Sequence, residues 1–444
     1  MLKNINKYQL LELVCIFIIT LFFNLICISM NQDEIWNYGF AYNIASGLIP
    51  YKDFNMVITP LYPILNAIIM LIFGKNIIIL HIVNSIICTM IFKYMKKNYQ
   101  NCYYIIYGIF LFFSLPNYNI FCLLLLYILI DLESKKTNDY IIGILIGIIF
   151  ITKQNIGIYL FIPTIITIIK NIKRIVNTTL GFIIPNIILL LYLIYNNSFY
   201  EFINYCFLGI NEFASKNISI NYIYLIILIL SMIYVIIKYI KTKENKYLYL
   251  SFYCFIAFPI IENYHTMLAF IPIFGYFLNE LDLNQKIISC TFILFILMIF
   301  AINSYKIYKN EYIYPNITNE YKYRKLLPSD AKSIKLISQY VNTIDEKIYL
   351  ITSTAYLIKL EGKISINKFD LLNNGNLGLN GDEKLIDEIK QTCEIEKCTF
   401  IVDITDTINP ELTQFNQRII HYIIDNYKDY GKIYNYELTI YKNY

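Results

Sequence analysis

The chain is dominated by a succession of apolar runs separated by short polar stretches. The first run extends from Gln9 to Met30 and contains a single acidic residue, Glu12. Ten further runs follow, at 76–92, 102–116, 118–130, 140–152, 155–169, 175–195, 220–237, 247–261, 264–278 and 287–304. A helix that crosses a bilayer needs about 20 apolar residues, so we expect Tyr-rich flanks to extend the shorter runs. The pattern predicts an α-helical polytopic membrane protein with about eleven transmembrane helices.

The composition of the 444-residue chain agrees with this class, because 57% of the residues are hydrophobic and 16% are charged, with a mean hydropathy of +0.51. Soluble globular domains contain about 45–50% apolar and about 25% charged residues. These values exclude a soluble, disordered or coiled-coil protein. No basic stripe stands out in the sequence, which argues against a nucleic-acid partner.

The distribution of cationic residues predicts the orientation, because cytoplasmic loops carry an excess of Lys and Arg. With the N-terminus in the cytoplasm and 60–73 lying against the membrane as an interfacial helix, 15 of the 19 cations in residues 1–305 are cytoplasmic. The other four are Lys52, Lys75, Lys153 and Lys216. We therefore expect a multi-pass protein of the plasma membrane whose C-terminal tail lies outside the cytoplasm.

Residues 306–444 have a different character, with 18 cations and 19 acids. Short β-rich runs at 347–353, 399–404 and 432–441 alternate with helical patterns at about 330–342, 382–392 and 411–427. This alternation predicts a small extracytoplasmic α/β domain. The chain is thus divided into a transmembrane domain, 1–305, whose first outward loop is 31–75, and a C-terminal domain, 306–444.

The ten cysteines do not suggest a framework of disulfides. Eight of them lie in or near apolar runs, where a thiol behaves as a small hydrophobe. Cys393 and Cys398 lie in the tail. The sequence leaves open whether they form a local disulfide or remain two free thiols. Zinc would need further ligands, and the three histidines, His81, His265 and His421, form no metal-binding motif. No metal site is predicted.

The first outward loop concentrates the polar groups of the membrane domain. Asp33 and Glu34 directly follow the first apolar run, Trp36 is the only tryptophan of the chain, and Tyr51 and Asp53 come later in the loop. In one interpretation, Asp33 caps a surface helix and the aromatic side chains form a belt at the membrane interface. In the other, a carboxylate at the water–lipid boundary is partly desolvated, which raises its pKa and makes it a better base.

The order of these features resembles that of the GT-C membrane glycosyltransferases. A first helix is followed by Asp33-Glu34, a loop rich in Trp and Tyr, the segment GLIPYKDF at 47–54 and a T-P-x-x-P pattern at 59–63. The pattern is most similar to the branch that contains the protein O-mannosyltransferases and the aminoarabinose transferase of lipid A. The resemblance covers roughly residues 9–305 and does not include the tail.

The resemblance implies transfer of a sugar from a polyprenyl-phosphate-linked donor to an acceptor hydroxyl on the outer face of the membrane, with inversion. Asp33 would be the general base, Glu34 would orient Asp33 or bind the acceptor, and Asp53 is the second candidate for the base. The acceptor would be a cell-envelope glycan, lipid or protein. No cofactor is expected, because relatives with this motif need no divalent cation, although the three carboxylates offer oxygen ligands for one.

A phosphate leaving group needs cationic or N–H partners. Lys153 and Gln154, in the tight outward turn 151–157, are the first candidates, and relatives of the family have similar Lys-Gln turns. His265, in the polar segment 262–266, resembles a His or Tyr position of the family. The alternatives are a snorkelling lysine and a hydrogen-bonded interface histidine. Trp36 and Tyr51 complete the predicted substrate-binding residues.

Two other functions are open from the sequence. A transporter or flippase of a lipid-linked glycan would carry ionisable residues within its spans and broken helices in two related halves. Glu12 is nearly the only acid well inside an apolar run, and no related halves are visible. A catalytically silent scaffold would keep the fold and lose the chemistry of the acidic site. Substitution of Asp33 separates such a scaffold from an enzyme.

Overall fold

The computed structural model describes residues 6–27, 32–210, 219–282, 285, 291, 328–351, 368–369, 377–403, 417–432 and 438–443. Contacts within the chain divide it into two compact units. The first consists of Met1–Asn37, Ile78–Leu191 and Ile218–Tyr312, and the second of Tyr38–Ile77, Tyr192–Asn217 and Ile313–Tyr444.

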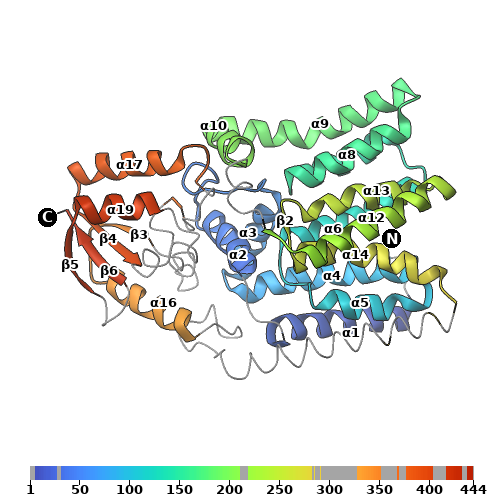
Figure 1. Cartoon of the computed structure of the whole chain (residues 1–444), viewed down its shortest axis with the longest axis horizontal. Coiled ribbons are helices and arrows are strands. Elements are labelled where there is room, and N and C mark those ends of the chain that lie inside the picture. Colours follow the sequence, from blue (N-terminus) through green and yellow to red (C-terminus); the bar gives the residue numbers. More distant parts are fainter. Residues whose placement is uncertain are drawn as a thin grey trace. The chain divides into compact units, whose positions relative to one another are not determined.

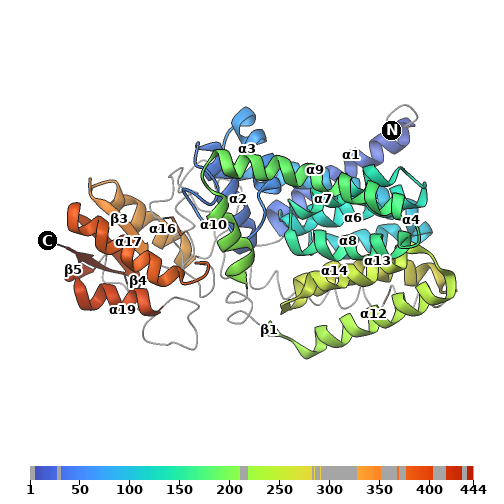
Figure 2. The ribbon, with the colours of Figure 1, turned by 90° about the horizontal axis from the view of Figure 1, so that it is seen from above.

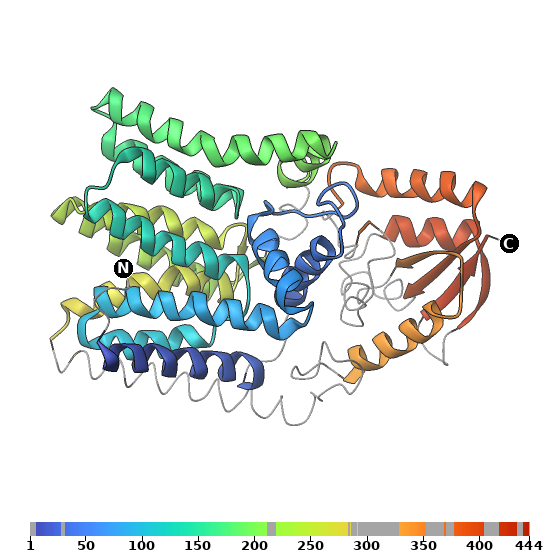
Figure 3. The same cartoon turned by 180° about the vertical axis from the view of Figure 1, so that it is seen from behind.

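The first unit is built from apolar helices (Figures 1 and 3). Each of the first ten predicted runs contains a helix: α1 (Lys7–Phe22), α4 (Ile77–Asn98), α5 (Tyr103–Leu111), α6 (Tyr118–Ser134), α7 (Asp139–Phe150), α8 (Gln154–Ile168), α9 (Ile172–Tyr195), α12 (Tyr222–Thr242), α13 (Asn245–Tyr253) and α14 (Asn263–Glu280). By length and composition, α1, α4, α9 and α12 can cross a membrane. The run 287–304 lies almost entirely outside the described residues, so the count of eleven spans stays a prediction.

The polar residues between the runs determine where several of these helices begin. Asn117, Asn138 and Asn221 are the N-caps of α6, α7 and α12. In each case the side-chain oxygen accepts a hydrogen bond from the backbone N–H two residues later. Asparagine is a preferred N-cap because it satisfies an N–H group that the helix itself leaves unpaired.

Glycines allow close packing around α7. A Cβ at Gly143 or Gly147 would lie only 2.1 or 2.6 Å from carbonyl oxygens of α9, and this small-xxx-small spacing lets membrane helices approach each other closely. At Gly157 of α8, a Cβ would lie 2.4 Å from the Cα of Phe150 at the end of α7. The absence of a side chain at Gly157 therefore permits the tight α7–α8 turn that carries Lys153.

The later helices of the first unit pack against one another and against α6 and α8. Helix α12 packs along α13 and α14, and α13 also contacts α6 and α8 (Figure 2). Two short strands, β1 (Ser219–Ile220) and β2 (Ile260–Ile261), pair in parallel. Because β2 leads directly into the start of α14, this pairing fixes the polar segment 262–266 beside the beginning of α12.

The tail in the second unit contains a sheet of order β3–β4–β6–β5 with helices on both faces (Figures 1 and 3). Its strands are β3 (Lys347–Ile351), β4 (Cys398–Asp403), β5 (Lys428–Lys432) and β6 (Leu438–Lys442), and its helices are α16 (Pro328–Val341), α17 (Gly381–Ile395) and α19 (Gln417–Asn426). Strands β3 and β4 are parallel, and the other pairs are antiparallel. Ile337 of α16 packs against Ile348, Leu350 and Ile401 of the sheet.

These elements agree with two of the predicted strands and with the three predicted helices of the tail. The predicted β-rich run 432–441 contains most of β6 and the last residue of β5, and these two strands pair antiparallel. Alternating residue types do not show where a chain reverses. The placement of the tail outside the cytoplasm stays a prediction.

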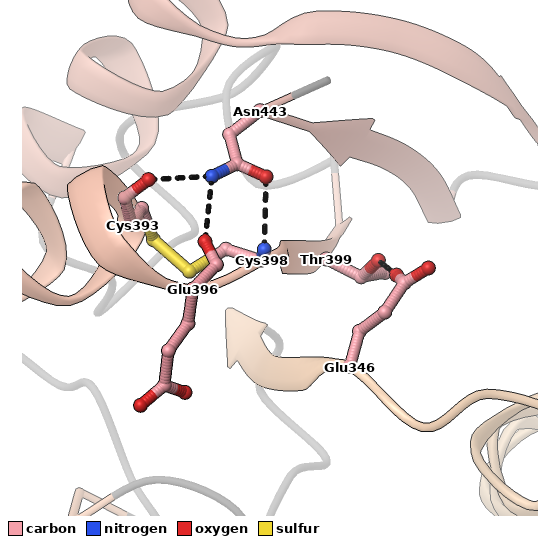
Figure 4. Close-up of a disulfide and its surroundings, with 6 residues drawn as sticks. All are labelled: Glu346, Cys393, Glu396, Cys398, Thr399 and Asn443. Atoms are coloured by element: carbon pink, nitrogen blue, oxygen red, sulfur yellow. Dashed lines mark hydrogen bonds between the residues drawn. A yellow bond between two sulfur atoms is a disulfide. The ribbon is translucent and has the colours of Figure 1, made fainter.

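A disulfide closes one corner of the tail (Figure 4). It joins Cys393 near the end of α17 to Cys398 at the start of β4. The side-chain amide of Asn443 donates to the carbonyl oxygens of Cys393 and Glu396 at 2.6 and 2.9 Å, and its oxygen accepts from the Cys398 N–H at 2.9 Å. Of the two outcomes left open by the sequence, the structure therefore has the disulfide.

The second unit also contains most of α2 (Gln32–Ala45), the helices α3 (Leu61–Phe73) and α10 (Phe199–Ile203), and the loops beside them. These loops contact the tail, since the Asn55 N–H donates to the carbonyl of Lys368 at 3.0 Å and the Leu379 N–H donates to Asn204 Oδ1 at 2.9 Å. Residues 38–77 and 192–217 thus group with the tail. The predicted boundary near 305 lies outside the described residues.

Helix α3 occupies the segment that the sequence predicts to lie against the membrane. One of its faces is buried, through Tyr62, Asn66 and Met70. Its other face exposes apolar side chains, namely Leu65, Ile68, Leu71, Ile72 and Phe73. An apolar face of this kind suits an interfacial helix, and its position relative to a bilayer stays a prediction.

Candidate active site

Asp33 and Glu34 lie in the first turn of α2 and have different surroundings. The Asp33 side chain is half-buried, and its Oδ2 accepts a hydrogen bond from Asn117 Nδ2 at 3.0 Å. The Glu34 side chain is fully buried, and its Oε1 lies 2.7 Å from His81 Nε2 of α4. The two adjacent carboxylates are therefore held by different helices. Asp33 retains access to solvent, whereas Glu34 is enclosed.

The turn that begins α6, from the N-cap Asn117 to Asn119, connects the predicted site residues. Asn117 contacts Asp33, and Asn119 contacts two further groups. Its Oδ1 accepts from Lys153 Nζ at 2.8 Å, and its Nδ2 lies 3.5 Å from His265 Nε2. Thus Asp33, Lys153 and His265, which come from three separate parts of the chain, are bridged by two asparagines on one turn.

A buried polar network fixes the position of this turn. Ser114 Oγ donates to Asn24 Oδ1 at 2.9 Å, and the carbonyl oxygen of Ser114 accepts from the amides of Asn24 and Asn84 at 2.9 and 2.5 Å. These bonds join the segment after α1, helix α4 and the end of α5. Hydrogen bonds between buried groups favour a single arrangement, so these bonds position the segment that leads to Asn117.

Lys153 precedes α8 in the tight turn after α7. Its Nζ lies 5.1 Å from the centre of the Tyr118 ring, in addition to its bond with Asn119. Burial lowers the pKa of the Lys153 ammonium to about 8, although the nearby Asp33 opposes this shift. Gln154, the other residue predicted in this turn, is buried at the start of α8.

His265 lies in the first turn of α14 and has polar partners on both sides of its ring. Nδ1 is 3.0 Å from Glu262 Oε1, and Nε2 faces the amide of Asn119. The carboxylate orients the ring. As a result, Nε2 is directed toward the turn that also holds Lys153.

The environment of Asp33 makes its carboxylate a better base. Burial raises the pKa of Asp33, and the charge of Glu262 acts in the same direction. His265, Lys153 and the hydrogen bond from Asn117 act in the opposite direction without cancelling the rise. A carboxylate whose pKa lies closer to neutrality accepts a proton more readily. This is the condition that the sequence predicts for a base at the membrane surface.

The other predicted residues of the first outward loop have different positions. Trp36 is half-buried in α2. Asp53 is exposed, and its Oδ2 accepts from the backbone N–H of Ile49 at 2.7 Å, which closes a turn. The hydroxyl of Tyr51, which is fully buried, donates to the carbonyl of Ile58 at 2.7 Å. Asp53 and Tyr51 thus stabilise the loop of the second unit.

Among the residues that the structure describes, no three His, Cys, Asp or Glu side chains form a group that could hold a metal ion. Asn117, Asn119 and His81 are the site residues that sequence reasoning missed. The signal for the first two was the pair of asparagines around Tyr118, at the junction of two apolar runs on the predicted outer side. His81 gave no local signal, because it lies within an apolar run.

Comparison with known proteins identifies the fold. No protein-family model matches the chain, and no curated protein matches it in sequence. Among solved structures, it is similar to that of ArnT from Cupriavidus metallidurans bound to undecaprenyl phosphate, with a TM-score of 0.60 over 99% of each chain and 9% sequence identity. The chain shares the fold of that structure. The predicted resemblance is thus confirmed at the level of the fold, for a mostly helical membrane protein with a small sheet.

Proposed function

We propose that the chain is a membrane glycosyltransferase that moves a sugar from a polyprenyl-phosphate-linked donor to an acceptor hydroxyl, with Asp33 as the general base. The observation that carries this proposal is the turn 117–119. It holds a carboxylate with a raised pKa through Asn117 and a cation through Asn119. A displacement at an anomeric carbon needs both groups close together, because one takes a proton and the other meets a leaving anion.

The proposed reaction is a single displacement. Asp33 accepts the proton of the acceptor hydroxyl, and the hydroxyl oxygen forms a bond to the anomeric carbon. The bond between that carbon and the phosphate oxygen breaks, and its electron pair leaves with the lipid phosphate. Inversion follows from attack on the side opposite the leaving group. Lys153 would stabilise the departing phosphate. His265 Nε2 accepts from the Asn119 amide while the ring is neutral, so it would contribute only as the doubly protonated imidazolium.

The surroundings of the three carboxylates support different roles for Asp33, Glu34 and Asp53. Asp33 is the half-buried carboxylate, whereas Glu34 is enclosed and bonded to His81. This favours orientation over acceptor binding for Glu34. Asp53 uses its carboxylate to close a turn, so we place the base at Asp33. Gln154 and Trp36 are retained as substrate contacts.

Two observations support a site on the outer side of a plasma membrane. All the turns that meet around Asn117 and Asn119 are those that the distribution of cations predicts to be outward. The tail has a disulfide between Cys393 and Cys398, which is typical of proteins in oxidising compartments. We therefore propose that the donor lipid, the acceptor and the tail meet on the extracytoplasmic side.

Glu12 does not favour a transporter. Its carboxylate is 2.5 Å from Lys96 Nζ and accepts a bond from the hydroxyl of Tyr104 at 2.7 Å. An acid within an apolar helix that already has a cation and a donor is explained by structure alone. A transfer assay on Asp33 variants distinguishes the hypothesis of a catalytically silent scaffold from that of an enzyme.

Membranes from a strain that expresses the chain would receive a panel of radiolabelled polyprenyl-phosphate sugars, and incorporation of label into acceptor would be measured. We expect Asp33→Asn to lower transfer at least about a hundredfold, the effect of losing a general base. Asp53→Asn is the matched control, and it should retain transfer. Equal transfer by Asp33→Asn and wild type would exclude Asp33 as the base. Absence of transfer by wild type with every donor would contradict the proposal that the chain is a glycosyltransferase.

A further inference from the structure

Glu34 and His81 form a pair that is sealed from solvent. Both side chains have 0% exposure, and Glu34 Oε1 lies 2.7 Å from His81 Nε2. Burial of a carboxylate is unfavourable unless it is paired and hydrogen-bonded. The pair joins the first turn of α2, at the start of the first outward loop, to the first turns of α4, which follows that loop.

The direction of Glu34 also determines that of its neighbour. Successive residues on an α-helix project about 100° apart. When Glu34 is bonded to α4, the helix α2 has one rotation about its axis, and Asp33 then projects toward Asn117. A change in the rotation of α2 would break the bond between Asp33 and Asn117 before it disturbed the backbone.

We propose that His81 is a positioning residue that acts through Glu34 to hold the Asp33 carboxylate against Asn117. His81 is not in contact with solvent, so we assign it no contact with substrate and no part in proton transfer from the acceptor hydroxyl. The contact between Asp33 and Asn117 that His81 maintains exists whether or not sugar is transferred. The effect of His81 on sugar transfer rests on the proposed function of Asp33.

The charged and titratable groups that face Asp33 come from four elements. Glu34 is its neighbour on α2, Lys153 lies on the α7–α8 turn, and Glu262 and His265 lie at the start of α14. Tyr118 at the start of α6 also senses the charge of Asp33. Of these groups, Glu34 is the one bonded to His81, so substitution of His81 reaches Asp33 through Glu34. A shift equal to that of Asn117→Ala would identify the change as lost positioning of Asp33.

The test uses the full-length protein in membranes and a hydrophobic carbodiimide, which labels protonated carboxyl groups. Mass spectrometry measures labelling at Asp33 as a function of pH. His81→Asn shortens the side chain so that its amide no longer reaches Glu34, whereas His81→Gln places an amide nitrogen near the position of Nε2. His421→Asn, in an exposed turn of α19, is the control.

We expect His81→Asn to raise the labelling midpoint of Asp33 by about one pH unit, the effect of losing one hydrogen bond to a carboxylate. Asn117→Ala should give the same shift, and the double variant should give no larger shift, because both changes remove one contact. His81→Gln and His421→Asn should match wild type. A midpoint in His81→Asn at or below that of wild type overturns the proposal, as does an additive shift in the double variant.

If His81→Asn does not give folded protein, His81→Leu repeats the test with the apolar volume retained. Transfer supplies the second measurement. His81→Asn should lower kcat about ten- to a hundredfold and leave the donor KM within about twofold, and His81→Gln should restore kcat. Carbodiimide labelling of Asp33 can be measured whether or not the protein transfers sugar. A wild type that shows no transfer therefore contradicts the proposed function alone, while the labelling midpoints still decide the role of His81.

Discussion

The two ends of the helices around α6 hold their charges in opposite ways. At the end predicted to be cytoplasmic, Lys97 and Lys135 both contact the carboxylate of Asp131. At the other end, Lys153 is held by the amide oxygen of Asn119, and Asp33 by the amide nitrogen of Asn117. The first arrangement cancels charge. The second fixes the position of each charged group through a neutral amide.

The end predicted to be cytoplasmic shows the same compensation around its cavity. A cavity of about 360 Å³ is lined there by Lys97, Lys243 and Lys246 and by Asp131, Glu133 and Glu244. Partly exposed ion pairs of this kind contribute little to stability. A charge that a neutral amide holds in place is available to a charged reactant, because preorganised groups need no rearrangement during reaction. The comparison thus distinguishes lysines that are paired with carboxylates, at the end predicted to be cytoplasmic, from Lys153, whose charge is available to a substrate.

The largest effect should come from exchanging a lysine at each end for methionine. Lys153→Met removes the cation proposed to meet the leaving phosphate, so transfer should fall about a hundredfold and the donor KM should rise. Lys97→Met, at the other end, should leave transfer per folded protein within about twofold. Initial rates over a series of donor concentrations measure both. Equal losses in the two variants would remove the distinction between the ends.

The pH dependence of transfer sharpens the assignment of Lys153. Its pKa is lowered to about 8 by burial, so its positive charge is present below that pH and is lost above it. Transfer should therefore decline above about pH 8. Lys153→Arg keeps its charge at every accessible pH, and the decline should disappear in the part of its activity that remains. An unchanged alkaline limb in Lys153→Arg would assign the decline to another group.

A smaller effect is expected from the asparagine that bridges the cation and the histidine. Asn119→Leu removes the partner of Lys153 and His265, and we expect transfer to fall about tenfold, since a charge-assisted hydrogen bond contributes about 1.5–3 kcal/mol. Asn138→Ala, at the N-cap of α7, should lower stability by about 1 kcal/mol without changing kcat. Thermal unfolding and kcat would be measured for both. Loss of kcat in Asn138→Ala alone would contradict this assignment.

The smallest effect should follow from breaking an ion pair at the end predicted to be cytoplasmic. Arg174 Nη2 lies 2.7 Å from Asp139 Oδ1, and the Arg174 side chain is 43% exposed. Arg174→Met should lower the free energy of unfolding by less than about 1 kcal/mol and leave transfer unchanged. A chemical unfolding curve and the transfer assay check this. A marked loss of transfer would show that this end also serves the reaction.

Most of the candidate site could be located, but not assembled, from the sequence. Asp33, Lys153 and His265 were recognisable because each is a polar residue in a turn between apolar runs on one predicted side. Asn117 and Asn119 were missed because an asparagine between two runs also serves as an ordinary helix cap. His81 was missed because only its partner across the fold distinguishes it from other polar residues in an apolar helix.

The sequence by itself determined the apolar helices, the bias of cations toward one side and the α/β pattern of the tail, since each depends on residue type and local spacing. Only the tertiary structure decided that one turn bridges Asp33, Lys153 and His265, that Glu34 is enclosed with His81, and that Asp53 closes a turn. Those outcomes depend on which helices approach one another closely, as the glycines of α7 and α8 allow. Residues distant in the chain meet through packing, which no local pattern contains.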